Sequence, residues 1–266
     1  MSMTKTELLN KCAQSEEERM LLARTLDKLE LARTRSVPAC TGFLSPGERA
    51  SVEALLNAAG HPRHLFFGGY EGAERTLCAF LPDWQEEDGW VNGDCPVSAL
   101  RASFPEDAAL SHRDFLGSIL GLGITREKVG DLLVERGRCD IIILKEIEPF
   151  LLLHLEGAGR TRLRLSPIGL AALTPKTPEV RLIRDTVATL RLDAVAATGF
   201  SLPRSKAADL ISSGKLHLNH RECLKPDKAV AEGDVLTCRG LGKCVIRSAG
   251  GLSKKGRIML ELERYI

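Results

Sequence analysis

The chain lacks paired cysteines, long hydrophobic runs and a large net charge. Its eight cysteines contain no Cys-x-x-Cys pair, which argues against a zinc site and against a disulfide framework and favours reduced, buried thiols. The longest apolar runs, residues 141–144 and 150–153, are far too short to span a membrane, and the polar first residues predict no signal peptide. We therefore expect a cytoplasmic protein that uses neither a metal nor another cofactor.

What the chain has is the composition of a soluble globular protein, with 44% hydrophobic and 27% charged residues in a length that allows two or three domains. The net charge of +2 conceals an uneven distribution. Residues 176–266 contain 17 Lys and Arg but 10 Asp and Glu, whereas the other 175 residues contain 20 and 25. Positive charge in the last third predicts contact with a nucleic acid or another anionic surface. Membrane binding is the weaker alternative, because no basic helix with large apolar side chains accompanies the charge.

The N-terminal part predicts helices followed by a small α/β region. Residues 1–35 fit one or two amphipathic helices. The stretch Ser45-Pro46-Gly47-Glu48 is a capping box that begins another helix, which Gly60 ends. Residues 65–67 and 77–81 are expected to pair as strands through a glycine-rich turn.

Residues 97–165 alternate strand and helix in an order that predicts a ferredoxin-like plait, the architecture of the common RNA-recognition fold. The expected elements are a strand at 97–104, a helix from Ser111 to 122, strands at 129–134 and 139–144, a helix at 147–155 and a strand at 161–165. These strands carry no aromatic signature for stacking RNA bases, so we predict the plait without base-stacking recognition. Residues 174–178, Thr-Pro-Lys-Thr-Pro, are the predicted linker to the basic last third.

Two short helices are predicted at the start of that last third. Apolar residues spaced three and four apart from Leu192 give the first helix one apolar face. Ser201 is the expected N-cap of the second helix, with Pro203 in its first turn, and Gly214 stops it.

Arg204, Ser205 and Lys206 then fall in the first turn of the second helix, where unpaired backbone N–H groups and the helix dipole favour an anion. Cations on an electropositive helix end are unfavourable unless a polyanion binds there, so a phosphate is the predicted ligand. Alone, such a cluster is more often ordinary solvated charge. The complete order of cations, glycine stops and turns over residues 191–242 favours RNA binding instead.

This ordered stretch resembles the S-four RNA-binding module, which is named after a small-subunit ribosomal protein. The residues predicted to contact RNA are the polar and basic positions of the module and of the strands after it: Arg191, Ser201, Arg204, Ser205, Lys206, Lys215, Asn219, Lys225, Lys243, Lys254, Lys255 and Arg257. Residues 111–131, with this module and the tail Lys254-Lys255-Gly256-Arg257, are similar to the YlmH family of bacterial proteins. The resemblance implies a ribosome-associated RNA-binding protein without known catalysis. It also implies a link to quality control of large subunits that still hold peptidyl-tRNA after stalling.

The YlmH-like segment also contains four candidate docking residues: His112, Arg113, Arg126 and Lys128. His112-Arg113-Asp114 is not expected to transfer protons, because adjacent residues on a helix do not face one another, and a cap is the more natural role of Asp114. His61-Pro62-Arg63-His64 lacks a third metal ligand at suitable spacing. Gly240-Leu241-Gly242-Lys243 lacks the spacing of a phosphate loop and is a predicted turn between strands.

Three other classes of protein stay open. Pseudouridine synthases carry the S-four module, usually ahead of a large catalytic domain, whereas 24 residues follow Gly242 here. A tyrosyl-tRNA-synthetase-like enzyme places the module last, but the upstream region shows no recognisable nucleotide-binding motif. A division-linked regulatory scaffold could bind RNA only incidentally.

We therefore expect an α+β chain in three parts: N-terminal helices with a small α/β region (1–75), a ferredoxin-like, RRM-like domain (76–173), and an S-four domain with basic C-terminal strands (179–266). The predicted partners are structured RNA, as rRNA or tRNA, and the large ribosomal subunit. No preference for DNA and no membrane contact are expected, and the predicted state is a monomer.

Overall fold

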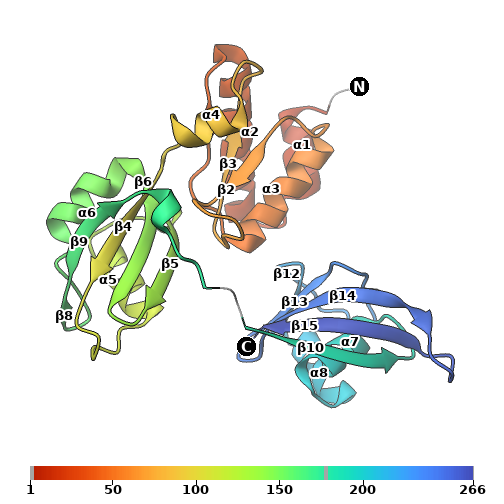
Figure 1. Cartoon of the computed structure of the whole chain (residues 1–266). Helices are drawn as coiled ribbons and strands as arrows, with labels where there is room; N and C mark the ends of the chain where they lie inside the picture. Colours follow the sequence, from red (N-terminus) through yellow and green to blue (C-terminus); the bar gives the residue numbers. More distant parts are fainter. Residues whose placement is uncertain (1–2, 177–178, 266) are drawn as a thin grey trace. The chain divides into compact units, whose positions relative to one another are not determined.

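The computed structural model describes residues 3–176 and 179–265, and the chain divides into two compact units, residues 1–176 and 177–266 (Figure 1). Residues 177 and 178 of the predicted linker lie outside the described residues. All eight cysteines are free, and five of them are buried. Within the described residues, no helix combines the length and the apolar character that crossing a membrane requires.

The N-terminal part of the first unit consists of helices around a three-stranded sheet with the strand order β1-β3-β2. Its elements are α1 (Lys5–Cys12), α2 (Glu16–Arg35), β1 (Ala39–Cys40), α3 (Pro46–Ala58), β2 (Leu65–Phe67), β3 (Leu77–Phe80) and α4 (Glu87–Asn92). The predicted capping box is confirmed, because Ser45 and Glu48 each bond the backbone N–H of the other at the start of α3. Strand β3 pairs with both β1 and β2, so the predicted domain boundary at residue 76 lies too early and cuts this sheet.

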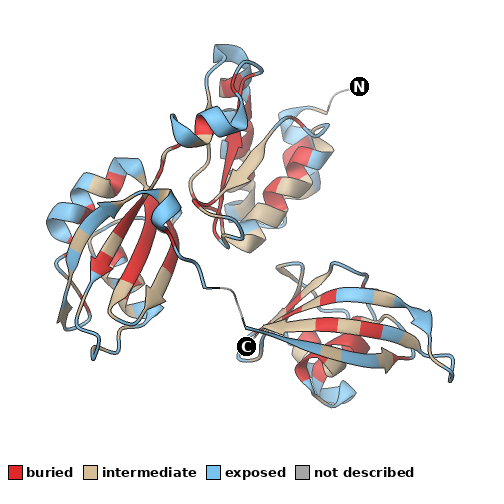
Figure 2. Cartoon of the chain, in the orientation of Figure 1, coloured by how far each residue is buried: buried red, intermediate tan, exposed pale blue. Residues whose placement is uncertain are grey.

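The middle of the first unit is an antiparallel sheet with the strand order β5-β6-β4-β9. Its elements are β4 (Val97–Ser103), α5 (His112–Gly121), β5 (Val129–Glu135), β6 (Arg138–Leu144), α6 (Glu148–His154), the small hairpin β7 (Gly157–Ala158) and β8 (Thr161–Arg162), and β9 (Arg164–Ile168). The chain order and the sheet order are those of the predicted ferredoxin-like plait. Both helices cover one face, where Leu100 and Ile141 of the sheet share a buried cluster with Phe115 of α5 and Leu151 of α6 (Figure 2).

The other face of this sheet packs against the N-terminal part of the same unit. Ala99 and Ile142 of the sheet belong to one buried cluster with Phe43 and Trp90. The approach is close, because a Cβ at Gly130 would lie 2.9 Å from the ring of Phe43. The two parts of the first unit therefore share a core.

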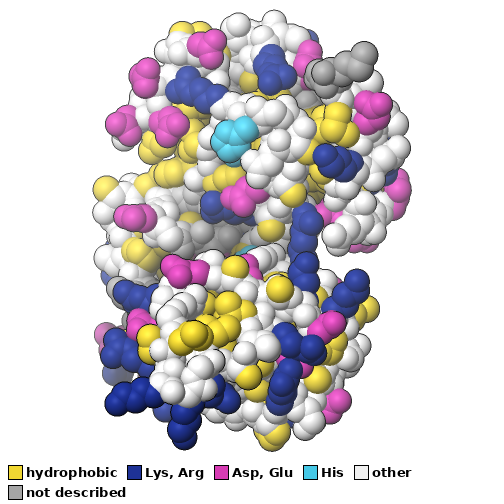
Figure 3. All heavy atoms as spheres, turned by 90° about the vertical axis from the view of Figure 1, so that its right-hand side faces the viewer, with side chains coloured by type: hydrophobic (Ala, Val, Ile, Leu, Met, Phe, Trp, Pro, Cys, Tyr) yellow, Lys and Arg dark blue, Asp and Glu magenta, His cyan; other side chains and the backbone are white. Residues whose placement is uncertain are grey.

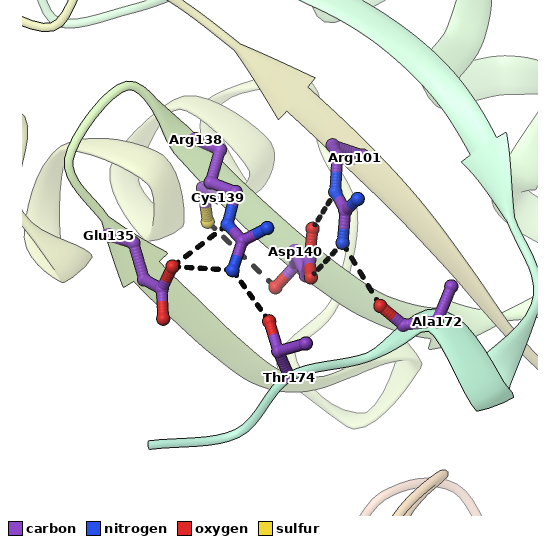
Figure 4. Close-up of polar contacts among 7 residues, drawn as sticks. All are labelled: Arg101, Glu135, Arg138, Cys139, Asp140, Ala172 and Thr174. Carbon is purple, nitrogen blue, oxygen red and sulfur yellow. Dashed lines mark hydrogen bonds and ion pairs between the residues drawn. The ribbon is translucent and has the colours of Figure 1, made fainter.

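Two arginines hold the chain that leaves β9 across the remainder of this face (Figure 4). Arg101 forms a bidentate pair with Asp140, at 2.7 Å for both contacts, and also donates to the carbonyl oxygen of Ala172 at 3.1 Å. Arg138 pairs with Glu135 and donates to Thr174 Oγ1 at 2.6 Å. The face that an RNA-recognition fold uses for base stacking is thus covered by the protein itself, and its strands carry no aromatic residue.

The C-terminal unit is a six-stranded antiparallel sheet, in the order β10-β15-β14-β13-β11-β12, with two helices on one face. Its elements are β10 (Val180–Val187), α7 (Leu192–Phe200), α8 (Arg204–Ser212), β11 (Leu216–Leu218), β12 (Arg221–Glu222), β13 (Val235–Cys238), β14 (Gly242–Leu252) and β15 (Ile258–Tyr265). The apolar faces of α7 and α8, including Val195 and Ile211, pack on Leu236 and Leu262 of the sheet.

One helix-boundary prediction is wrong. Ser201 does not cap α8 but ends α7, in a left-handed conformation with φ of 56°, and Pro203 occupies the N-cap position of α8. The left-handed residue turns the chain sharply after Phe200, so that α8 returns along α7. Arg204, Ser205 and Lys206 form the first turn of α8 as predicted.

Candidate nucleic-acid interface

Asp193, in the first turn of α7, joins two of the predicted RNA-contact residues. Its carboxylate accepts hydrogen bonds from Arg191 Nη2 at 3.2 Å and from Arg204 Nη2 at 3.0 Å. The Asp193 side chain is 7% exposed, whereas those of Arg191 and Arg204 are 41% and 53% exposed. Burial alone would raise the pKa of Asp193, but the hydrogen bonds and charges of the two arginines outweigh burial and lower it. Asp193 is therefore an ionised anchor beneath two exposed cations.

Both guanidinium groups keep donors that Asp193 does not use. A guanidinium carries five N–H donors, and Arg191 employs its Nε and Nη2 while Arg204 employs its Nη2. One carboxylate against two guanidinium groups leaves the cluster positively charged. Fixed, exposed arginines with free donors are suited to bind phosphate, which they can contact through two parallel hydrogen bonds.

A loop between β12 and β13 adds cations beside this cluster. The N–H groups of Leu192 and Asp193 donate to the carbonyl oxygens of Lys228 at 2.8 Å and Pro226 at 2.9 Å, which holds the loop against the start of α7. The side chains of Lys225 and Lys228 are exposed. Lys225 is among the residues predicted to contact RNA, whereas Lys228 is not, although the Lys-Pro-Asp-Lys stretch places the two lysines three residues apart.

Lys215 and Asn219, also predicted, have different environments. Lys215 is exposed directly after Gly214, whose φ is +68° and whose Cβ would collide with the side chain of Glu222 in β12. Asn219 uses both ends of its amide within the protein, donating to Asp234 and accepting from the N–H of Val235, each at 2.8 Å. Asn219 thus holds a turn, and its contact with RNA stays a prediction.

Four other predicted residues lie at the two ends of the long β14–β15 hairpin. Lys254 and Lys255 are exposed at its tip, and Arg257 there donates to Thr186 Oγ1 at 2.9 Å. The tip lies at the end of the sheet where β10 leads into α7, because Val187 pairs with Ile258. Lys243 lies at the opposite end, with its Nζ 4.4 Å from the ring centre of Tyr265.

We call the residues gathered around α7, α8 and the adjoining loop the helix–loop surface: Arg191, Arg204, Ser205, Lys206, Lys215, Lys225 and Lys228. Lys and Arg side chains also gather on the C-terminal unit at the bottom of Figure 3. The structure brings most of the predicted RNA-contact residues together on this surface or at the hairpin tip, and separates Lys243 from the tip.

The four candidate docking residues of the middle region divide into two pairs. His112 and Arg113 are exposed at the start of α5. Arg126 donates to the carbonyl oxygen of Val129 at 2.5 Å, and Lys128 pairs with Glu146 at 3.1 Å. Arg126 and Lys128 are therefore engaged within the first unit, whereas His112 and Arg113 face solvent.

A buried network next to Arg126 explains this engagement. Asp131 accepts hydrogen bonds from the hydroxyl of Tyr70 at 2.8 Å and from the N–H of Arg75 at 3.1 Å. Arg75 donates to the carbonyl oxygens of Phe43 and Arg126, and burial followed by the charge of Arg126 lowers the pKa of Arg75 to about 10. The network fastens the loop before β3 to the plait.

Comparison with known domain families finds two matches. Residues 94–172 match the family described as the RNA-binding domain in YlmH, and residues 190–236 match the S4 domain, the S-four module. The first match covers the plait from the start of β4 to the segment held by Arg101, and the second covers α7, α8 and the loop beside them. The chain therefore matches two domain families, one in each of its two units.

Two individual proteins resemble the chain over much of their length. The "Ribosome-associated protein quality control protein P2" of Bacillus subtilis (strain 168) is 28% identical over 249 residues, which are 93% of this chain and 95% of that protein. The solved structure of "Cell division protein ylmH from Streptococcus pneumoniae" is similar with a TM-score of 0.51 and 21% identity. It covers 60% of this chain and 95% of that chain, and the likeness shows the fold.

Proposed function

Because this chain is YlmH-like and carries two RNA-binding domains, we propose that it is a non-catalytic RNA-binding protein that acts on the ribosome. The observation that carries the proposal is the helix–loop surface, where Asp193 fixes two exposed arginines beside further cations within an S-four domain. The ligand we propose is rRNA or tRNA on the large subunit, with no preference for DNA.

The cellular role we propose is quality control of large subunits that hold peptidyl-tRNA after stalling. The B. subtilis protein, which matches nearly the whole chain, is named for ribosome-associated quality control. The basic C-terminal unit would contact RNA, while the more acidic first unit is less attracted to bare RNA. We propose a monomeric, cytoplasmic protein oriented in this way on a ribonucleoprotein particle.

Gradient fractionation tests this role. We expect the full chain to sediment with free large subunits more than with translating polysomes in cells with stalled translation. The double variant R204Q/K206Q should move to the soluble fractions, because it removes two cations from the helix–loop surface. The matched control K11Q/R35Q removes two exposed cations from α1 and α2 and should sediment like the wild type. Equal sedimentation of R204Q/K206Q and the wild type would contradict the proposed anchor.

Absence of catalysis is part of the proposal and has its own support. Asp114, the one acidic residue of the His-Arg-Asp stretch, accepts hydrogen bonds from the N–H of Ser111 at 2.8 Å and its Oγ at 2.6 Å, so it caps α5. Mass spectrometry of rRNA and tRNA incubated with the protein should find unaltered bases. A stoichiometric change such as uridine isomerisation would favour the modifying-enzyme alternative.

A further inference from the structure

A segment of the middle region carries a run of positive charge without acidic residues of its own. Residues 157–178 contain no Asp or Glu, although the first 175 residues as a whole are acidic. Within this segment, Arg160, Arg162 and Arg164 occur at every second position. We call these three residues the arginine ladder.

The structure places the arginine ladder along one exposed edge of the plait. Arg160 lies in the turn of the β7–β8 hairpin, Arg162 ends β8, and Arg164 begins the edge strand β9. Leu163 and Leu165 between and after them pack on the core under α5 and α6. Because side chains alternate in an extended chain, Arg162 and Arg164 point away from that core, at a spacing of roughly 7 Å. All three arginines are exposed.

Other arginines of the same domain differ from the arginine ladder in having ion-pair partners. Arg101, Arg136 and Arg138 each form an ion pair with an acidic side chain. Across residues 94–172, all of which the structure describes, the ladder arginines form no such pair. Three guanidinium groups are thus held next to one another without an ion-pair partner among these residues, an arrangement in which an external polyanion gains most.

The arginine ladder continues towards the start of α5. A Cβ at Gly159, in the hairpin turn, would lie 3.7 Å from Oδ1 of Asp114. The turn therefore lies beside the first turn of α5, where Arg113 is exposed. The Asp114 carboxylate, which caps α5, thus lies beside this end of the arginine ladder, and the exposed Arg113 directly precedes it in the chain.

We propose that the arginine ladder binds the phosphate backbone of RNA and is the RNA contact of the middle domain. The inference rests on the proposed function, RNA binding by this chain, and adds a second site in the other unit. The sheet face is covered by the N-terminal part and by the segment that Arg101 holds, so the domain must contact RNA through another surface. Arginine forks match phosphate geometry, and no large hydrophobic side chain of residues 157–166 is exposed to enter a membrane.

A simpler role for these residues is protection of the sheet edge. Charged side chains on an edge strand prevent pairing with another chain, and β9 is an edge strand. That role requires charge on β9 itself and predicts self-association when the charge is removed. RNA binding instead requires the whole row, including Arg160 in the turn outside β9.

The test uses the full chain and deproteinised large-subunit rRNA, with affinity measured from about 50 to 200 mM salt. The variant R160Q/R162Q/R164Q should lower the slope of log affinity against log salt by about two units, since each lost phosphate contact removes about 0.7 to 0.9. The variant R160K/R162K/R164K keeps the charge and should keep the slope. The control K11Q/R33Q/R35Q removes three exposed cations from α1 and α2 and should also keep it.

The outcomes distinguish RNA binding from protection of the sheet edge. If R160Q/R162Q/R164Q has a native circular dichroism spectrum and the salt slope of the wild type, the proposed site is overturned. If this variant also self-associates, the arginines protect the sheet edge instead. A loss equal to that of K11Q/R33Q/R35Q reduces the effect to overall charge and also overturns the site. If the wild-type chain itself does not bind rRNA, the proposed function fails, which is a separate result. Loss of slope in both this variant and R204Q/K206Q supports two independent contacts.

Discussion

Replacing Asp193 by asparagine should destabilise the C-terminal unit through one defined contact. The change removes the charge of a side chain that is 7% exposed and that accepts hydrogen bonds from Arg191 and Arg204. Hydrogen bonds to charged groups contribute about 1.5–3 kcal/mol when buried, and exposed ion pairs about 0.2–1 kcal/mol. Because the side chains of Arg191 and Arg204 are about half exposed, water can replace part of the hydrogen bonding that they lose with the Asp193 carboxylate. We therefore expect D193N to lower the free energy of unfolding by about 2 kcal/mol, equivalent to a melting point lower by about 10 °C for a unit of this size.

The stability difference between the wild type and D193N should also depend on pH in a defined way. The pKa of Asp193 is lowered in the folded state, so its contribution is fully present above the pKa of the unfolded chain, near 3.8. That contribution is lost as the pH falls through the folded pKa. The stability difference between wild type and D193N should thus be constant near neutral pH and shrink below about pH 4.

The assay must report on the C-terminal unit alone. Both tryptophans, Trp84 and Trp90, belong to the first unit, so their fluorescence serves as an internal control that D193N leaves that unit intact. Amide hydrogen exchange in α7 and α8, read by mass spectrometry, reports on the second unit. The matched control D209N removes an exposed carboxylate from α8. Equal protection in D193N and D209N, or a stability difference that persists in acid, would refute the anchoring role of Asp193.

Three further substitutions test the packing. G199A should lower stability by about 1–3 kcal/mol, because its Cβ would lie 2.7 Å from Sγ of Cys244, as measured by thermal unfolding. G117A, in the interior of α5 with nothing within 4 Å of a new Cβ, should raise stability by about 0.5–1 kcal/mol in the same assay. D140A should lower the stability of the first unit by about 2–4 kcal/mol in urea titrations followed by tryptophan fluorescence, because it leaves Arg101 unpaired on the sheet face.

Elements governed by local rules could be predicted from the sequence. The capping box at Ser45, the alternation of strand and helix over the plait, and the first turn of α8 all depend on neighbours within a few residues. The boundary between α7 and α8 could not be predicted in this way, because a serine two residues before Pro203 suits an N-cap, whereas the structure places Ser201 in a left-handed turn that ends α7. The return of α8 onto Asp193, eleven residues from Arg204, decides between them.

Contacts between distant segments could not be predicted either. In the sequence Asp193 is the second residue after Arg191, and nothing local shows that Arg204 meets its carboxylate. Likewise, the sequence predicts the plait without base-stacking recognition, but it does not show that Arg101 and Arg138 hold the segment after β9 across the sheet face. The missing aromatic residues were the one local indication that this face has another role.

Two proposed RNA contacts in two units have a consequence for the size of the ligand. A linked pair of sites gains affinity only when one ligand reaches both, because binding at the first raises the effective concentration at the second. A short RNA hairpin fills one site, so R204Q/K206Q and R160Q/R162Q/R164Q should each have a small effect on its affinity. A large subunit can occupy both, so either variant should weaken that binding by a larger factor. If each variant weakens binding of the hairpin and of the large subunit by the same factor, the two surfaces do not act together on one ligand.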